Sequence, residues 1–123
     1  MTDQPTPPRG PYADIAPALD DLTQRVLFGE VSERPGLSKR DRSLVTAAAL
    51  VAGYHTNELP FHLRRAVENG VTRDELIEAI THLAYYAGWP AASTAFGIAR
   101  EVLAGQRESP ASAHSSRPSI GSV

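Results

Sequence analysis

A carboxylate and an imidazole four residues apart are the side chains of this chain best suited to proton transfer. Glu58 precedes His62 by four residues in a segment whose pattern predicts a helix, so the two side chains share one face. On such a face a carboxylate can orient an imidazole, raise its basicity or share a proton with it. The stretch from Gly29 to Val102 holds three of the four histidines, where the pattern predicts buried helices. Buried helices seldom carry so many titratable groups without a functional reason.

His55 raises the question of a metal site, because it precedes Glu58 by three residues and His62 by seven. An H-x-x-E-x-x-x-H stripe could bind a metal if the helix began early. Asn57 and Pro60 instead indicate that His55 lies in the preceding turn, and an i, i+7 pair spans roughly 10 Å along a helix. We therefore predict no metal site, and an ordinary Glu–His surface pair remains the alternative to catalysis.

Three further side chains are candidates for binding a substrate. Arg42 stands at the start of a very apolar predicted helix, where a guanidinium needs a carboxylate partner from the protein or from a ligand. His82 is either a hydrogen-bonded structural group or a contact for substrate. Tyr86, like Tyr85, could donate its hydroxyl to a bound oxyanion, although aromatic residues beside Trp89 are usually part of a core or an interface.

Composition limits the class of protein. With 123 residues, 41% of them apolar, the chain should form one compact domain, and its net charge of -2 with interspersed signs argues against a nucleic-acid partner. Cysteine is absent, which excludes disulfides and thiol chemistry. No run approaches the roughly 20 apolar residues of a membrane span, and the start of the chain does not resemble a signal peptide. We expect a cytoplasmic protein that does not associate with membranes.

Both ends of the chain differ from its middle. Residues 1–13 are rich in proline, and residues 105–123 are rich in serine, proline and glycine, so both are predicted to be disordered tails around a domain of residues 14–104. His114 lies in the second tail and is given no role.

Helical spacing and cap residues predict an all-α domain. Thr72 and Glu75 form a capping box that marks a helix start, and Gly70 and Gly88 mark helix ends. After Arg42 the second helix is apolar nearly all round, which predicts a central position. Alanines on the last two helices favour close helix packing and a homo-oligomer. The five predicted helices cover about residues 17–29, 39–53, 58–69, 73–87 and 90–103.

The same residues resemble a known family. The patterns E-L-x-x-H, A-x-x-N-G-V-T-x-x-E and Y-A-G-x-P-A-A, within about Ala18 to Leu103, resemble the carboxymuconolactone decarboxylase family, a branch of the alkylhydroperoxidase AhpD-like fold. The resemblance implies helical protomers assembled into rings, as trimers or hexamers. In redox members a C-x-x-C motif precedes the histidine. His55 and Glu58 take those positions here, which excludes thiol redox activity.

The resemblance implies a decarboxylase whose substrate carries a carboxylate γ to an unsaturated lactone carbonyl. That carbonyl accepts the electrons left by carbon dioxide, so neither pyridoxal nor a metal cofactor is needed. The protein must position the carboxylate, face the developing enolate oxygen and deliver a proton to carbon. The roles implied are proton transfer for His62, orientation of His62 for Glu58, anion binding for Arg42, and contact with the oxygen for His55 or His82, with Tyr86 also lining the substrate site.

Several positions depart from the family pattern. Ser32 stands where many members have tryptophan, Ser43 where a glutamate relay is found, His55 at an arginine position and His82 at a glutamine position. These differences favour another lactone or a keto acid as the substrate. A cofactor-free isomerase, cyclase or hydrolase acting on an enolisable carbonyl and a non-catalytic assembly protein are the alternatives.

Overall fold

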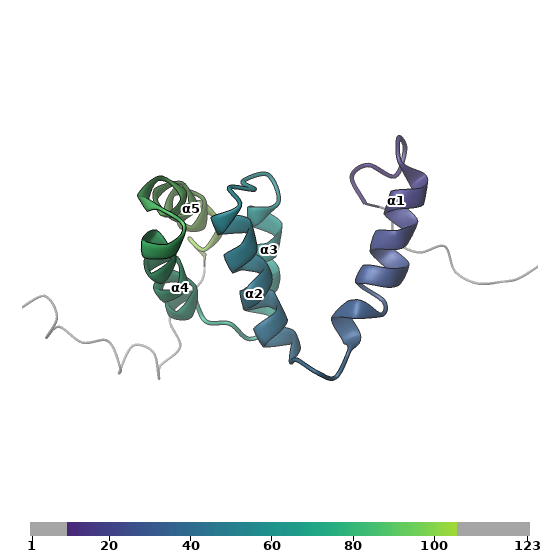
Figure 1. Cartoon of the computed structure of the whole chain (residues 1–123), viewed down its shortest axis with the longest axis horizontal. Helices are drawn as coiled ribbons and strands as arrows, with labels where there is room; N and C mark the ends of the chain where they lie inside the picture. The colour runs from purple at the N-terminus through teal and green to yellow at the C-terminus, as the bar shows by residue number, and fades with distance from the viewer. Residues whose placement is uncertain (1–9, 106–123) are drawn as a thin grey trace, which may run out of the picture. The chain divides into compact units, whose positions relative to one another are not determined.

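Every regular element described by the computed structural model, which covers residues 10–105, is a helix, as predicted (Figure 1). The chain divides into two compact units, Met1–Lys39 and Arg40–Val123. The predicted domain of residues 14–104 includes parts of both units. The tail predictions for residues 1–9 and 106–123, and with them His114, lie outside the described residues.

The first unit contains α1 (Pro17–Leu22), a π-helical turn η1 (Thr23–Leu27) and a short 3₁₀ turn η2 (Val31–Glu33). Pro17 opens α1, as predicted, and the helix continues into the π-helical turn, where the N–H of Phe28 donates to the carbonyl of Thr23 at 2.9 Å. The first helix is amphipathic in sequence, which predicts that its apolar face packs, but that face is substantially exposed, with Leu19 at 54%. The unit ends at Lys39, which pairs with Glu33 at 3.0 Å.

The second unit contains α2 (Lys39–Ala52, which begins at the last residue of the first unit), α3 (Leu59–Glu68), α4 (Arg73–Tyr86) and α5 (Trp89–Val102). The capping box at the start of α4 is confirmed: Thr72 accepts from the N–H of Glu75 at 3.0 Å, and Glu75 accepts from the N–H of Thr72 at 2.9 Å. No helix within residues 10–105 is long and apolar enough to span a membrane.

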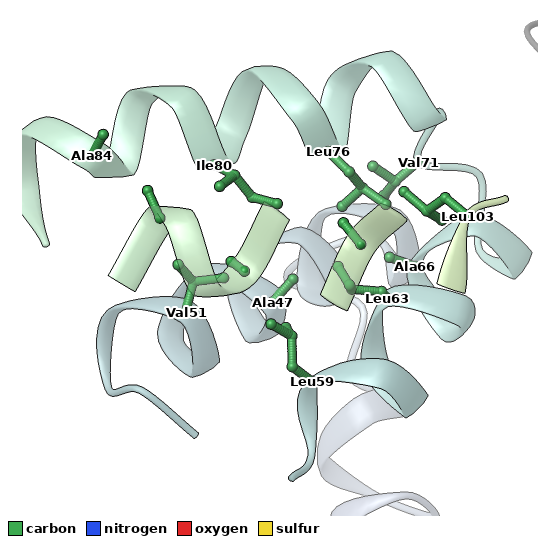
Figure 2. Packing of buried hydrophobic residues seen from close by; sticks show 13 residues of the cluster. Ala47, Val51, Leu59, Leu63, Ala66, Val71, Leu76, Ile80, Ala84 and Leu103 are labelled. Carbon is green, nitrogen blue, oxygen red and sulfur yellow. The ribbon is translucent and has the colours of Figure 1, made fainter. Parts of the chain in front are cut away.

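The core of the second unit forms where α5 packs against both α3 and α4. Figure 2 shows Leu76 and Ile80 of α4 on one side of this core and Leu59 and Leu63 of α3 on the other. Three buried alanines of α5 belong to this core, and their small side chains let the helices approach closely. They are Ala92, Ala95 and Ala99. Because Leu59 and Leu63 are 1% and 0% exposed, α3 is held in one rotational setting.

The second helix is not the central helix that its sequence predicts. On α2 only Ser43, Ala47 and Val51 are buried, and Val45 on another face is 59% exposed. The prediction was wrong because four of the apolar positions are alanines, whose small side chains offer little apolar area and so gain little from burial.

Two turns with the same hydrogen-bond pattern hold α3 at both ends. At the end of α3, the N–H of Gly70 donates to Val67 at 3.0 Å and the N–H of Val71 to Ala66 at 2.9 Å, with φ of 103° at the glycine. This pair of backbone hydrogen bonds is a Schellman motif, in which glycine usually supplies the left-handed residue.

The turn between α2 and α3 has a tyrosine in the left-handed position. The N–H of Tyr54 donates to Val51 at 3.1 Å and that of His55 to Leu50 at 2.8 Å, with φ of 61° at Tyr54. A residue with a large side chain is an outlier in this conformation, which costs about 1–2 kcal/mol. The backbone that carries His55 is therefore strained.

Candidate active site

His62 lies in the first turn of α3, beside two fully buried leucines, and is itself half-buried. Its ring meets the ring of Phe61 edge to face, with 4.9 Å between centroids. The buried face of α3 thus fixes the direction in which this imidazole points.

The environment of His62 favours its neutral form. Burial lowers its pKa below the ordinary value of 6.5, and the positive charge of Arg65 lowers it further. Glu58 acts in the opposite direction but has the smallest effect of the three. At neutral pH the imidazole is therefore uncharged and can accept a proton.

Glu58 occupies the N-cap position of α3, with an exposed side chain that makes no capping hydrogen bond. Its backbone carbonyl accepts the N–H of His62 at 3.3 Å, which confirms the predicted four-residue relation. The carboxylate acts on the imidazole through its charge. It raises the basicity of His62, as expected, but burial and Arg65 outweigh it.

His55 lies in the turn before α3, as its neighbours predicted, and is exposed. Its ring lies against the bare backbone of Gly53, because a Cβ placed there would be 2.6 Å from Cδ2 and 2.7 Å from Nε2 of His55. The prediction that the histidines lie buried was wrong for His55 and His82. Both are exposed, because His55 lies in the turn before α3 and His82 lies on the exposed face of α4. The H-x-x-E-x-x-x-H stripe is broken at this turn, and within residues 10–105 no three His, Cys, Asp or Glu side chains are grouped for a metal.

Tyr54 and Gly53 are the site features that sequence reasoning missed. The hydroxyl of Tyr54 lies 3.2 Å from that of Thr94, which joins the α2–α3 turn to α5. A glycine just before the strained residue was visible in the sequence, but a left-handed tyrosine has no sequence signal of its own.

Arg42, on α2, lies near the C-terminal end of α3, whereas Glu58 lies at the N-terminal end of that helix. The neighbouring Ser43 is buried and accepts a hydrogen bond at 2.8 Å from the side-chain amide of Asn69, at the end of α3. His62 precedes Asn69 by seven residues, roughly 10 Å along the helix axis. The structure therefore places Arg42 and His62 on neighbouring helices at different heights, and the position matched to the family's glutamate serves instead to join α2 to α3.

His82 and Tyr86 lie together on the exposed face of α4, with 4.8 Å between ring centroids. Tyr85 and Trp89 form a second pair beside them at 5.2 Å. We call these four residues the aromatic patch. The helix α5 packs against both α3 and α4 and lies between them in Figure 2. It therefore separates α4, which carries His82 and Tyr86, from α3, which carries His62. The structure places Glu58 and His62 one turn apart at the start of α3, with His55 in the preceding turn against Gly53, and His82 and Tyr86 lie apart from them on α4.

The fold and this site describe an all-helical protein with an acid–base pair at the start of a helix. Its sequence matches the model of the carboxymuconolactone decarboxylase family over residues 17–101, and the chain belongs to that family. The resemblance seen in the motifs is thereby confirmed.

Named relatives give the membership more detail. The 4-carboxymuconolactone decarboxylase of Acinetobacter baylyi is 46% identical over 90 residues, which cover 73% of this chain and 67% of the relative. The nitrosuccinic acid decarboxylase of Metarhizium robertsii is 37% identical over 83 residues, 68% of this chain and 58% of the relative. An uncharacterized 15.0 kDa protein of Paracoccus denitrificans is 31% identical over 76% of this chain and 72% of its own. These similarities support an enzyme of the decarboxylase type.

Proposed function

We propose that this chain is a cofactor-independent decarboxylase of a small carboxylated lactone, γ-carboxymuconolactone or a relative of it. The observation that supports it most is the half-buried His62, whose pKa is lowered and which lies within the residues that match the family. Both decarboxylases similar to this chain are named for carboxylic acids. An unsaturated lactone and a nitro group can each accept the electron pair that a departing carboxylate leaves.

The proposed step breaks the bond between the γ carbon and its carboxylate. Carbon dioxide leaves, the electron pair moves into the unsaturated carbonyl to form an enolate, and His62 delivers a proton to carbon. The bound carboxylate raises the pKa of His62, so the imidazole takes up a proton as substrate binds. Loss of neutral carbon dioxide moves the negative charge from the carboxylate onto the enolate, whose carbon then takes the proton from the imidazolium and leaves His62 neutral again.

The other residues have supporting roles in this proposal. Glu58 raises the basicity of His62 through its charge. His55, at the turn, faces the developing oxygen, and Arg42 binds the substrate anion. His82 and Tyr86 line the substrate site from a neighbouring protomer, because within one protomer they lie on a separate helix from His62.

A homo-oligomer, trimeric or hexameric, is part of the same proposal. The aromatic patch exposes Tyr85 at 77%, Tyr86 at 79% and Trp89 at 59%, and large exposed apolar surfaces usually mark interaction sites. Val45 adds exposed apolar surface on α2.

Turnover of γ-carboxymuconolactone tests the proposed reaction. The loss of substrate absorbance and the release of carbon dioxide should rise together with the wild-type protein, and His62→Ala should lower both by at least about 100-fold. Arg64→Gln, a change at an exposed residue of α3, is the matched control and should leave the rate unchanged.

Each failure has a distinct meaning. Absorbance loss without carbon dioxide release would favour the isomerase, cyclase or hydrolase alternative. A wild-type rate equal to that of His62→Ala would reject this substrate for the site.

A further inference from the structure

A second concave site lies on the second unit, between the start of α4 and the end of α5. This hollow of about 450 Å³ is lined by residues of both helices, none of which belongs to the candidate active site. They are Arg73, Ile77, Phe96, Ala99, Arg100, Leu103 and Ala104. On α4 the hollow begins at the first residue, whereas His82 and Tyr86 lie in its last two turns. It is therefore distinct from the aromatic patch as well.

The inner part of the hollow is apolar. Ala99 and Leu103 are 3% and 4% exposed, and the partly buried Ile77 and Phe96 lie beside them. A hydrocarbon group placed against these side chains would remove apolar surface from water on both partners, which favours binding.

Two guanidinium groups from different helices line the same hollow. Arg73, the first residue of α4, is 3.8 Å from the carboxylate of Asp74, too far for a hydrogen bond, and its side chain is 39% exposed. Arg100, in the last turn of α5, is exposed. The charged residues that line the hollow are these two arginines, and the nearby Asp74 offsets part of the charge of Arg73, so a ligand with a single negative charge is favoured.

We propose that this hollow binds a small amphipathic carboxylate. Its carboxylate group lies between Arg73 and Arg100, and its apolar body lies over Ile77, Phe96 and Leu103. Arginine suits a planar carboxylate because its fork of N–H groups matches the two oxygens. The volume falls within the roughly 300–1,000 Å³ of ordinary small-molecule sites. A phosphate fits less well, because its remaining oxygens would face apolar side chains that offer no hydrogen bonds.

This site is independent of the proposed decarboxylase activity. Since none of its residues lies in the turn around His55, Glu58 and His62, occupancy of the hollow does not require turnover, and turnover does not require an occupied hollow. The protein thus has a place for an organic acid apart from its substrate.

The first test titrates the full chain with 4-phenylbutyrate and follows backbone amides by ¹H–¹⁵N NMR. Saturable shifts should appear at Ile77, Phe96, Arg100 and Leu103. The neutral analogue 4-phenylbutyramide, which has the same apolar body, should bind about tenfold more weakly. Equal affinity for the two compounds, absence of binding, or shifts confined to Glu58 and His62 would overturn the proposal.

Matched variants test the role of the guanidinium group. Arg100→Gln should weaken 4-phenylbutyrate about tenfold and leave the weaker binding of the amide unchanged. Arg64→Gln removes an exposed guanidinium from α3, outside the hollow, and should change neither affinity. If both variants weaken binding equally, the attraction comes from overall charge and the assigned site is wrong. Thermal unfolding of each variant confirms that the fold is intact, and Arg100, being exposed, should not affect it.

Discussion

Tyr54 is a single strained residue next to His55, a candidate site residue. Its left-handed backbone would suit glycine better, and the glycine of this turn lies one position earlier, under the ring of His55. The hydroxyl contact with Thr94 offsets part of the strain. Strained residues cluster at functional sites, where the surrounding structure holds them. We infer that this arrangement keeps the ring of His55 against the backbone of Gly53, in the turn between α2 and α3.

At Tyr54 a glycine variant should be more stable than an alanine variant, which is the reverse of the usual order of stability. Tyr54→Gly and Tyr54→Ala both lose the contact with Thr94, but only alanine keeps the left-handed strain. The glycine variant should therefore be more stable by about 1 kcal/mol, as measured by urea unfolding. Equal stability, or a more stable alanine variant, would show that the turn is not strained.

Gly53→Ala should lower the rate without unfolding the protein. The added Cβ would lie 2.6 Å from the His55 ring, so the ring must move. We expect kcat/KM to fall about tenfold with little change in Tm, and no further fall when Gly53→Ala is combined with His55→Ala. A full additional loss in the double variant would mean that Gly53 acts on something other than His55.

The charges around His62 predict opposite pKa changes in two variants. Arg65→Gln should raise the pKa of His62 toward 6.5, and Glu58→Gln should lower it further. NMR titration of the imidazole measures both, and the acid limb of kcat/KM should move in the same directions. Identical titration curves in both variants would show that the charges of Arg65 and Glu58 do not set the pKa of His62.

The same shift has a defined effect on stability. Because the folded pKa lies below 6.5, the unfolded chain binds more protons as the medium becomes acidic. The contribution of His62 to stability is therefore present above 6.5 and declines as pH falls from that value through the folded pKa. Arg65→Gln should make this decline smaller.

At the scale of the helices, sequence signals with a local mechanism were the reliable ones. Thr72, Glu75 and Gly70 each satisfy backbone groups within a few residues, so the start of α4 and the end of α3 follow from the sequence. Burial depends on distant partners, which is why the exposed faces of α1 and α2 could not be predicted. The proximity of Glu58 and His62 is local and was predicted, whereas the separation of His82 from His62 depends on where α5 packs.

The capping box of α4 should contribute measurably to stability. Thr72→Ala removes the oxygen that accepts the N–H of Glu75 and should destabilise the protein by about 1 kcal/mol. Thr72→Ser keeps that oxygen and should recover most of the loss in urea unfolding. If serine and alanine are equally unstable, the methyl group rather than the hydrogen bond is responsible.

At the scale of the whole molecule, apolar surface on the second unit remains exposed in a single protomer. The aromatic patch holds three of these exposed side chains, Tyr85, Tyr86 and Trp89. In the homo-oligomer that we propose, the patch is buried between copies and lies beside the neighbouring copy's candidate active site, so that His82 and Tyr86 meet His62 across the interface.

Charge placed in the aromatic patch should therefore break the oligomer. Tyr85→Glu should lower the molar mass measured by light scattering to that of a smaller assembly, and catalytic rate should fall with it. The helical content should persist, because Tyr85 is 77% exposed in the protomer. Arg64→Glu changes charge on α3 and serves as the control, and an equal loss of mass in both variants would argue against this interface.

Lys39, the residue where the first unit ends and α2 begins, is the only lysine in the chain, and Trp89 at the start of α5 is the only tryptophan. The natural sequence thus carries one side-chain amine at the junction of its units and one indole donor in the second. A dye acceptor attached at Lys39, with Trp89 as donor, would form a single fluorescence energy-transfer pair within each protomer. Formation of the proposed oligomer could then be followed in solution, through added energy transfer between protomers, without adding or removing any residue.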